Sequence, residues 1–589
     1  MRVTGASLST MVVALLWAMP AAAVPPGFKA KADALLAEGF AADAPGVAVI
    51  VMDDGKVAYS AARGLADIDT KRQITPDTVF RLGSITKQFT AAVILQLAES
   101  GKLSLSDPIS KFLPEFPKPA GDVTVRQLLS HTSGLQTFTP GTSKANELTA
   151  TESLVAEIRG KPMQAAAGAQ YSYNNGGYVL LGAIIEKVTG RAWYQAVEEH
   201  ITRPLALTAI RYGVEEANVP AMARGYARMG GKIVPSQPFH MSFVHAAGAL
   251  TGTVGDLAKW AKALHGGKVV KSETYRQMIA RTRLTSGEQV AYAMGLENGE
   301  VRGRPTIGHG GRINGFAAES LYVPKEDLFV AVIANILPGG NTSTDSTALR
   351  LAGLALNDPY PSFTRAEVAM AQLEPLLGLY TWKGGVWLLS TRDGKMLLSR
   401  NLGGDVELSP AGGDRFFLPG TLEWLSIARD GAGKHVMTIH PGGTEKGETL
   451  VWSGRLPSAP PPANAPRAVE ASASQGSAQS QVSGIWFGEV RNPENNSVVR
   501  SMLELKAEGE TLTGAQIAGG TAPVPIKDGS VSGSKFTFLT SRGTSQNGIV
   551  TMKNIGEVKG DELTLAREVV GAAPSGGTPP PLVLKRVAR

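Results

Sequence analysis

Residues 80–92 read FRLGSITKQFTAA and contain the short motif Ser84-x-x-Lys87. Apolar residues continue beyond the motif at helical spacing, which predicts a helix that begins near Ser84 and ends near Ser100. Residues three apart share one face of a helix, so the Lys87 amine can reach the Ser84 hydroxyl. A serine hydroxyl is a weak nucleophile until a neighbouring base accepts its proton. The two residues are therefore a candidate nucleophile and base.

A serine and a lysine fall at this spacing often by chance, and a capped surface helix with a solvated lysine would explain an isolated match. A second motif, Tyr173-Asn174-Asn175, stands in a polar, Gly-containing loop before an apolar helix predicted over 178–189. A tyrosine on such a loop can act as a hydrogen-bond acceptor or acid, and an asparagine can orient a substrate carbonyl. An ordinary loop aromatic is the alternative.

A third motif, His309-Gly310-Gly311, precedes a turn at Gly315. Glycines let a backbone N–H group approach a ligand closely. A histidine beside that backbone can donate a hydrogen bond or a proton to a substrate. A solvated turn histidine is the alternative. The three motifs together make a more specific pattern than any one of them.

The composition of the 589 residues is that of a globular protein, with 43% hydrophobic and 19% charged residues and a net charge of +7. No basic run with interleaved aromatic residues is present, so nucleic-acid binding is not expected. Cysteine is absent, which excludes disulfides, thiolate metal ligands, a cysteine nucleophile and the lipid-anchor cysteine of bacterial lipoproteins.

The first 23 residues have the pattern of a secretory signal peptide. Arg2 precedes an apolar run over 11–22, and Ala21-Ala22-Ala23 offers a cleavage site. The run is too short to span a bilayer, and no other segment is long enough. We expect a periplasmic or secreted protein without a membrane anchor.

The chain length predicts about three domains. Apolar β-runs at 46–52 and 56–62 form one predicted hairpin, and those at 316–323 and 328–334 form another. Helices lie between them, which predicts an α/β (α+β) domain over 24–357 with one antiparallel sheet flanked by helices.

The texture then changes to short alternating strands with Gly-rich turns, which predicts a small β-barrel over 370–456. A Pro/Ala/Ser-rich linker is expected over 457–482. A second small β-barrel is expected over 483–589.

Taken in order, Ser84-x-x-Lys87, Tyr173-x-Asn175 and His309-x-Gly311 resemble the motifs of the serine β-lactamase and penicillin-binding-protein superfamily. The resemblance is to the branch of class C β-lactamases, D-amino-acid peptidases and β-lactamase-like esterases. Supporting stretches are VTVRQLLSHTSGL at 123–135 and GHGGRINGF at 308–316. The resemblance covers roughly 45–335 and implies a β-lactamase-like fold. The two β modules are similar to accessory barrels found behind such domains.

The resemblance implies acyl transfer through a covalent ester on Ser84. Lys87 and Tyr173 would share the transfer of its proton, with the identity of the resting base left open. The backbone N–H groups of Ser84 and Arg312 would form the oxyanion hole. Asn175 would contact the acyl side of the substrate, and Tyr173 would activate the hydrolytic water. The chemistry requires no metal and no organic cofactor.

Two positions depart from the β-lactamase pattern. His309 replaces the lysine that helps bind a substrate carboxylate, and His309, Gly311 and Arg312 are expected to be substrate-binding residues. Arg312 replaces a small residue, and its side chain either points to solvent or receives a carboxylate. His131, in contrast, is expected to brace a helix end.

The preferred function is an exported esterase or D-aminopeptidase acting on a small-molecule ester, amide or peptide. The alternatives are a penicillin-binding D,D-carboxypeptidase, a weak class C-type β-lactamase, or an inactive envelope-binding protein. In the last case the β modules would bind a cell-envelope polymer.

Overall fold

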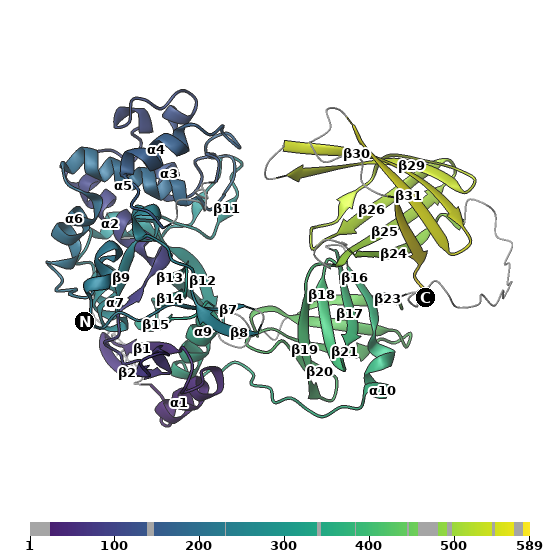
Figure 1. Ribbon diagram of the computed structural model, residues 1–589, viewed down its shortest axis with the longest axis horizontal. Coiled ribbons are helices and arrows are strands. Elements are labelled where there is room, and N and C mark those ends of the chain that lie inside the picture. Colours follow the sequence, from purple (N-terminus) through teal and green to yellow (C-terminus); the bar gives the residue numbers. More distant parts are fainter. Residues whose placement is uncertain are drawn as a thin grey trace, which may run out of the picture. The chain divides into compact units, whose positions relative to one another are not determined.

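The structure is a computed structural model, and contacts divide the chain into two units, Met1–Tyr360 and Pro361–Arg589 (Figure 1). The predicted signal peptide and nearly all of the predicted linker lie outside the described residues. The structure describes residues 24–137, 146–229, 231–337, 343–382, 385–443, 447–456, 481–491, 498–544, 548–570 and 581–588.

A six-stranded antiparallel sheet forms the centre of the first unit, in the order β12-β13-β14-β15-β1-β2. β1 pairs with β15 along its whole length, from Val47 opposite Ala334 to Asp53 opposite Leu328. The predicted first and last hairpins are therefore joined into one sheet. Its strands are β1 Val47–Asp53, β2 Lys56–Arg63, β12 Glu297–Val301, β13 Arg304–Ile313, β14 Phe316–Val323 and β15 Leu328–Ala334.

Both faces of this sheet are covered, which explains why β1 reads as a continuous apolar run. Ala48, Ile50 and Met52 of β1 face the larger core, with helices α2, α5 and α7. The alternate residues of β1 face a smaller core with α1 and α9. The helices of the unit are α1 Phe28–Gly39, α2 Thr86–Glu99, α3 Val125–Leu129, α4 Thr151–Arg159, α5 Asn175–Thr189, α6 Trp193–Val197, α7 Val254–His265, α8 Ser272–Ile279 and α9 Thr344–Ala355.

For two motifs, the secondary structure observed differs from the one that the sequence suggested. α5 begins at Asn175 rather than near residue 178, because the Asn174 side chain caps it by accepting the Gly176 N–H at 2.9 Å. His309, Gly310 and Gly311 lie inside strand β13 rather than in a loop before the turn. Glycines usually interrupt a strand, but here they admit another segment of backbone.

The second unit contains the two predicted β modules. Strands β16 to β23 form a closed barrel. The second module is a sheet in the order β25-β24-β32-β31-β30-β29-β28-β26-β27, and pairing of β25 with β26 closes it. The strands are β16 Gly378–Trp382, β17 Gly385–Arg392, β18 Lys395–Arg400, β19 Asp405–Gly412, β20 Arg415–Phe417, β21 Trp424–Arg429, β22 His435–His440, β23 Glu448–Gly454, β24 Gly484–Arg491, β25 Val498–Glu508, β26 Thr511–Ala518, β27 Val524–Pro525, β28 Lys527–Ser532, β29 Lys535–Thr544, β30 Gly548–Lys559, β31 Glu562–Val570 and β32 Leu582–Arg586.

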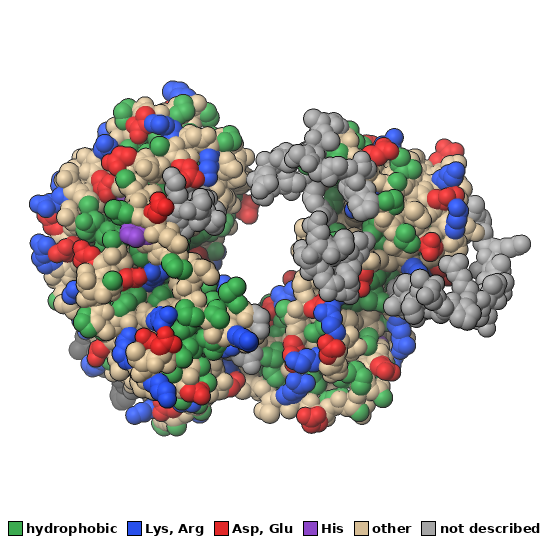
Figure 2. All heavy atoms as spheres, in the orientation of Figure 1, with side chains coloured by type: hydrophobic (Ala, Val, Ile, Leu, Met, Phe, Trp, Pro, Cys, Tyr) green, Lys and Arg blue, Asp and Glu red, His purple; other side chains and the backbone are tan. Residues whose placement is uncertain are grey.

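The two barrels share an apolar cluster that includes Leu388 of the first and Phe487 of the second. The Arg500 side chain, 7% exposed, bonds to Asp405 of the first barrel and to Glu489. On the face of the first unit seen in Figure 2, basic and acidic side chains are interspersed. Within the described part of the chain, no helix combines the length and apolar character that crossing a membrane requires.

Candidate active site

The Lys87 amine is the centre of a buried polar cluster at the start of α2. Its nitrogen lies 3.0 Å from Ser84 Oγ, 2.9 Å from Asn175 Oδ1 and 2.8 Å from the Ala247 carbonyl oxygen. The two carbonyl oxygens can only accept hydrogen bonds. A neutral amine has two N–H bonds and one lone pair. With both N–H groups donated to these carbonyls, the lone pair faces the Ser84 hydroxyl.

Burial also sets the charge of this amine. Lys87 is 0% exposed, and desolvation lowers its pKa well below the ordinary value, while the carboxylate of Glu297 opposes the shift. The neutral form is therefore favoured. Ser84 itself lies in a short 3-10 turn, Gly83–Ile85, that leads into α2, and the N-cap residue of α2 is Ile85.

Tyr173 also contacts the Ser84 hydroxyl. Burial raises the pKa of Tyr173, and a hydrogen bond with Ser84 partly offsets that increase. The Lys87 nitrogen lies 4.8 Å from the centre of the Tyr173 ring. The structure thus brings Ser84, Lys87, Tyr173 and Asn175 together, as the motifs predicted, and keeps the Tyr173 hydroxyl protonated.

His131 holds the loop that carries Tyr173. Its Nδ1 accepts the Asn174 N–H at 3.1 Å, and its carbonyl accepts the Ser172 N–H at 2.9 Å. The rings of His131 and Tyr173 lie 4.2 Å apart. The sequence suggested that His131 braces a helix end, and its ring does contact Asn174, the N-cap residue of α5, and with it the Tyr173 loop.

Two glycines bring strand β13 against the Ser84 turn. A Cβ added at Gly311 would lie 2.0 Å from the Leu82 carbonyl oxygen and 3.2 Å from the Ser84 nitrogen. A Cβ at Gly83, whose φ is +53°, would lie 2.9 Å from the Arg312 nitrogen. Only glycine permits this approach without displacing backbone.

The register of β13 then orients the Arg312 N–H. Ile313 and Phe316 close the two-residue turn between β13 and β14, and such a closing pair is hydrogen-bonded. Because hydrogen-bonded and open pairs alternate, Arg312 and Ala317 form an open pair. The Arg312 N–H therefore points away from β14, toward the edge where Ser84 lies. The backbone supplies two N–H groups there, those of Ser84 and Arg312.

The Arg312 side chain points away from this chemistry. It is 65% exposed, and its Nη2 lies 3.8 Å from Asp345 Oδ1 of α9. Of the two orientations considered from the sequence, the structure has the one toward solvent.

Both nitrogens of the His309 ring form hydrogen bonds within the protein. Its Nδ1 lies 2.5 Å from the Gly310 carbonyl oxygen, which only accepts, so Nδ1 carries the proton. Its Nε2 lies 2.9 Å from the Tyr292 hydroxyl, which therefore donates to it. Burial, followed by the effect of Lys87, lowers the pKa of His309 to about 3. The ring is neutral and 3% exposed, and its expected contact with a substrate stays a prediction.

Two contributors to the site were missed from the sequence. Tyr292 is buried and orients His309, but no motif surrounds it. Ala247 contributes its backbone carbonyl, and its alanine side chain gives no sequence signal for that role.

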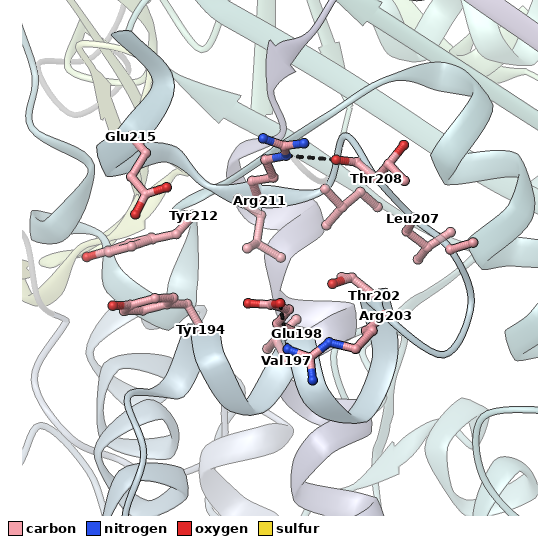
Figure 3. A pocket seen from close by; sticks show the side chains of 13 residues that line it. Tyr194, Val197, Glu198, Thr202, Arg203, Leu207, Thr208, Arg211, Tyr212 and Glu215 are labelled. Atoms are coloured by element: carbon pink, nitrogen blue, oxygen red, sulfur yellow. Dashed lines mark hydrogen bonds and ion pairs between the residues drawn. The ribbon is translucent and has the colours of Figure 1, made fainter. Parts of the chain in front are cut away.

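A separate cavity of about 550 Å³ lies between α6, the turn after it and strand β6 Arg211–Tyr212 (Figure 3). Tyr194 and Tyr212 stack at its side with ring centres 4.4 Å apart. Its lining includes none of the motif residues. Among the residues that the structure describes, no three or more His, Asp or Glu side chains are grouped so as to hold a metal ion.

The β-lactamase family model matches residues 32–354 of this chain. Protein flp of Staphylococcus aureus (strain MW2) is 28% identical over 305 residues, which are 50% of this chain and 60% of flp. The chain thus spans about three fifths of the length of this curated relative.

Two solved structures are similar in fold and sequence. The octameric penicillin-binding protein homologue from Pyrococcus abyssi has a TM-score of 0.53 and 25% identity, with 72% of this chain and 99% of that chain covered. The D-amino acid amidase from Ochrobactrum anthropi, in its complex with L-phenylalanine amide, has a TM-score of 0.50 and 25% identity. That match covers 56% of this chain and 98% of the amidase.

Proposed function

Because this chain belongs to the β-lactamase family of serine hydrolases, we propose that it hydrolyses esters or amides through an acyl-enzyme on Ser84. The observation that carries the proposal is the hydrogen bonding of Lys87. Two carbonyls take its N–H groups, and its lone pair faces Ser84 Oγ at 3.0 Å. A buried neutral amine in this position is a general base.

Opposite pKa shifts support different roles for the two proton carriers. The pKa of Lys87 is lowered by burial and that of Tyr173 is raised by burial. In our proposal Lys87 is the resting base, and Tyr173 is a protonated relay. The motifs alone left this choice open.

In the acylation step, the Lys87 lone pair accepts the Ser84 proton while Oγ bonds to the substrate carbonyl carbon. The carbonyl oxygen becomes an oxyanion between the N–H groups of Ser84 and Arg312. When the bond to the leaving group breaks, the Tyr173 hydroxyl donates its proton to that group and regains one from the Lys87 ammonium. Lys87 is neutral again, and the acyl group is esterified to Ser84.

Deacylation follows the same route with water. Water attacks the acyl carbonyl carbon and passes its proton to the Tyr173 oxygen, whose own proton moves to Lys87. The bond to Oγ breaks, and Lys87 returns the proton to Ser84. Tyr173 thus relays the proton of the water, with Lys87 as its final acceptor.

The proposed substrate preference rests on the absence of a lysine at the His309 position. A lysine at the His309 position would attract a substrate carboxylate, but His309 is neutral and occupied by Tyr292. The Arg312 guanidinium is directed toward Asp345. We therefore propose esters and amides, including amides of D-amino acids, over penicillins, cephalosporins and D-Ala-D-Ala peptides. The likeness to the D-amino acid amidase supports this choice.

The test uses the mature chain and its Ser84→Ala variant. The panel holds p-nitrophenyl acetate and butyrate, D-alanine p-nitroanilide, nitrocefin and a D-Ala-D-Ala peptide. Turnover of the esters or the anilide without nitrocefin, abolished in Ser84→Ala, is the expected result. Rapid turnover of nitrocefin or of the peptide would overturn the substrate preference. If a fluorophosphonate does not label Ser84, the hydrolase proposal fails and the inactive binding protein remains.

The signal-like pattern of residues 1–23 supports a second, separate proposal, export to the periplasm or the medium. Cell fractionation with and without this segment tests it. Binding of an envelope polymer by the barrels is likewise a proposal, and pull-down of the full chain with purified cell wall is its test.

A further inference from the structure

The turn that supplies the Ala247 carbonyl is anchored from the side opposite Lys87. This turn is the 3-10 segment His245–Ala247. His245 is 3% exposed and has a φ of +46°, a left-handed conformation that is rare outside glycine. Its carbonyl accepts the N–H groups of Gly248 and Ala249 at 3.1 and 3.0 Å. The conformation of His245 therefore determines where the next two carbonyls point.

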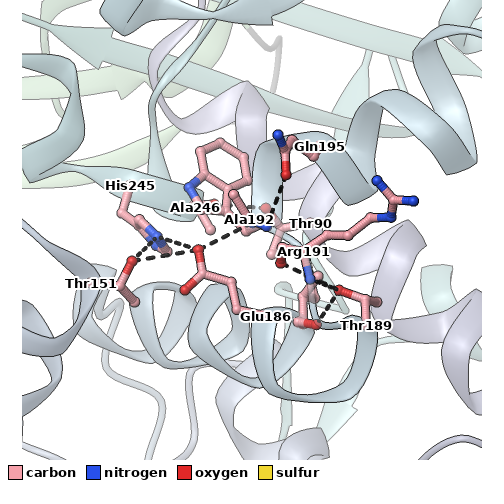
Figure 4. A network of polar contacts seen from close by, with 11 residues as sticks. Thr90, Thr151, Glu186, Thr189, Arg191, Ala192, Gln195, His245 and Ala246 are labelled. Atoms are coloured by element: carbon pink, nitrogen blue, oxygen red, sulfur yellow. Dashed lines mark hydrogen bonds and ion pairs between the residues drawn. The ribbon is translucent and has the colours of Figure 1, made fainter.

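The imidazole of His245 is held by α4 and α5. Its Nε2 lies 3.1 Å from Thr151 Oγ1 and 3.5 Å from Glu186 Oε1 (Figure 4). Glu186 Oε1 also accepts the Trp193 N–H at 3.1 Å. Burial raises the pKa of Glu186, but its contact with His245 and its other hydrogen bonds lower it on balance. The carboxylate form thus receives the Nε2 proton.

A glycine in α5 makes room for this ring. A Cβ added at Gly182 would lie 2.6 Å from His245 Cε1 and 2.7 Å from Nδ1. Among the described residues, Nδ1 has no hydrogen-bond partner, so the ring is placed by its other nitrogen and by packing. α2 contacts the same turn through Thr90 Oγ1, which donates to the Ala246 carbonyl at 2.8 Å.

Helix α5 therefore reaches Lys87 by two routes. Asn175, its first residue, bonds to the amine directly. Glu186, three turns further along the helix, reaches the amine through His245 and the Ala247 carbonyl. Both carbonyls must hold their places for the amine lone pair to face Ser84.

We propose that Glu186 and His245 are positioning residues for Lys87: they hold the His245–Ala247 turn so that the Ala247 carbonyl orients the amine toward Ser84. The inference rests on the proposed role of Lys87 as the base. Neither residue is among those expected to bind the substrate. Displacing a catalytic group by about 1 Å can cost about a hundredfold in rate. A substitution that disturbs the Glu186–His245 contact should therefore slow the chemical step.

Two glycines of α5 provide a matched pair of variants. Gly182→Ala forces a methyl group against His245. In Gly177→Ala the nearest atom to the new Cβ is the Leu128 carbonyl oxygen at 3.5 Å, an ordinary contact. Both changes place alanine in the same helix. A second pair is Glu186→Ala and Glu186→Gln, since glutamine keeps an oxygen for the Trp193 N–H and for His245.

The experiment titrates reactive Ser84 with a fluorophosphonate and then measures kcat and KM for p-nitrophenyl butyrate per titrated site. We expect Gly182→Ala and Glu186→Ala to lower kcat by about ten- to a hundredfold with KM nearly unchanged. Gly177→Ala and Glu186→Gln should stay within about threefold of wild type. A purely structural role would lower the titratable fraction and leave kcat per site unchanged.

Unchanged kcat per site in both Gly182→Ala and Glu186→Ala overturns the inference. If either fails to fold, Thr151→Val decides in its place, because it removes only the hydroxyl beside His245 Nε2 and should also lower kcat per site. A wild-type chain that the phosphonate does not label overturns the proposed function itself. The two failures are thus distinguishable.

Discussion

The Lys87 amine nitrogen lies 2.8 Å from the carbonyl oxygen of Ala247, a residue 160 positions further along the chain. Together with Asn175, this contact turns the amine lone pair toward Ser84. The contact also explains why Lys87 can be fully buried with no ion-pair partner among the described residues, because a neutral amine needs only hydrogen-bond acceptors.

Replacing Lys87 separates its basicity from its charge. In Lys87→Arg the side chain carries a positive charge and has no basic lone pair, and in Lys87→Met it has neither. Both variants should lose about 10²- to 10⁴-fold in kcat for p-nitrophenyl butyrate. Steady-state rates with purified protein measure this. Near-normal activity in Lys87→Arg would show that a cation, and not a base, is needed there.

The pH dependence of kcat/KM should report Lys87 on its acid side. Activity needs the neutral amine, so the rate rises as pH increases through the Lys87 pKa, which burial lowers from the ordinary 10.5. The acid limb of the pH–rate profile should therefore lie well below pH 10.5. Loss of the Tyr173 proton would lower the rate only above pH 10, because burial raises that pKa. A pH–rate profile with an acid limb near 10.5 would contradict the burial argument.

The close contact at Gly311 should be essential, and the Arg312 side chain should not be. Gly311→Ala places a Cβ 2.0 Å from the Leu82 carbonyl oxygen and must displace the Arg312 N–H. Loss of one oxyanion donor costs about 10²- to 10³-fold in kcat. Arg312→Ala, a control at the adjacent position, keeps the backbone N–H and should change kcat by about threefold at most. Equal losses in both variants would mean that the side chain acts in the site.

Acid should destabilise the catalytic domain through His309. The folded state holds this histidine neutral with a pKa of about 3, whereas the unfolded chain binds a proton below about 6.5. Between these values the unfolded state binds more protons, so stability falls as pH decreases, by roughly 1.4 kcal/mol per pH unit. Thermal melting between pH 7 and pH 4 measures this. His309→Asn should show a shallower dependence, and an identical slope would exclude His309 as a cause.

The barrel pair should depend on Asp405. Arg500 is 7% exposed and bonds to Asp405 and Glu489. Asp405→Ala leaves this buried guanidinium with fewer acceptors and should cost roughly 1–3 kcal/mol. Denaturant unfolding followed by tryptophan fluorescence measures the change, and kcat for the ester serves as the control. If Asp405→Ala lowers kcat without lowering the free energy of unfolding, this contact does not act through the stability of the barrels.

Much of the fold was predictable because the patterns that specify it are local. Apolar runs with turn residues between them predict the hairpins over 46–62 and 316–334, and both hairpins are part of the sheet. The barrels were predictable from alternation and Gly-rich turns. The start of α5 was misplaced, since a cap at Asn174 decides it and the apolar pattern does not. The strand containing His309 was missed because its glycines have the composition of a turn.

The sequence by itself predicted that the Lys87 amine reaches the Ser84 hydroxyl, since residues three apart share one face through the 3-10 turn and the first turn of α2. It also predicted Tyr173 and Asn175 as site residues, from the second of the three ordered motifs. Only the tertiary structure decided how Lys87 is oriented, because the Ala247 carbonyl and the His245–Glu186 contact come from distant segments. The roles of Tyr292 and of the Arg312 backbone were decided in the same way. A backbone group carries no side-chain signature, so its part in a site depends on strand register and close packing.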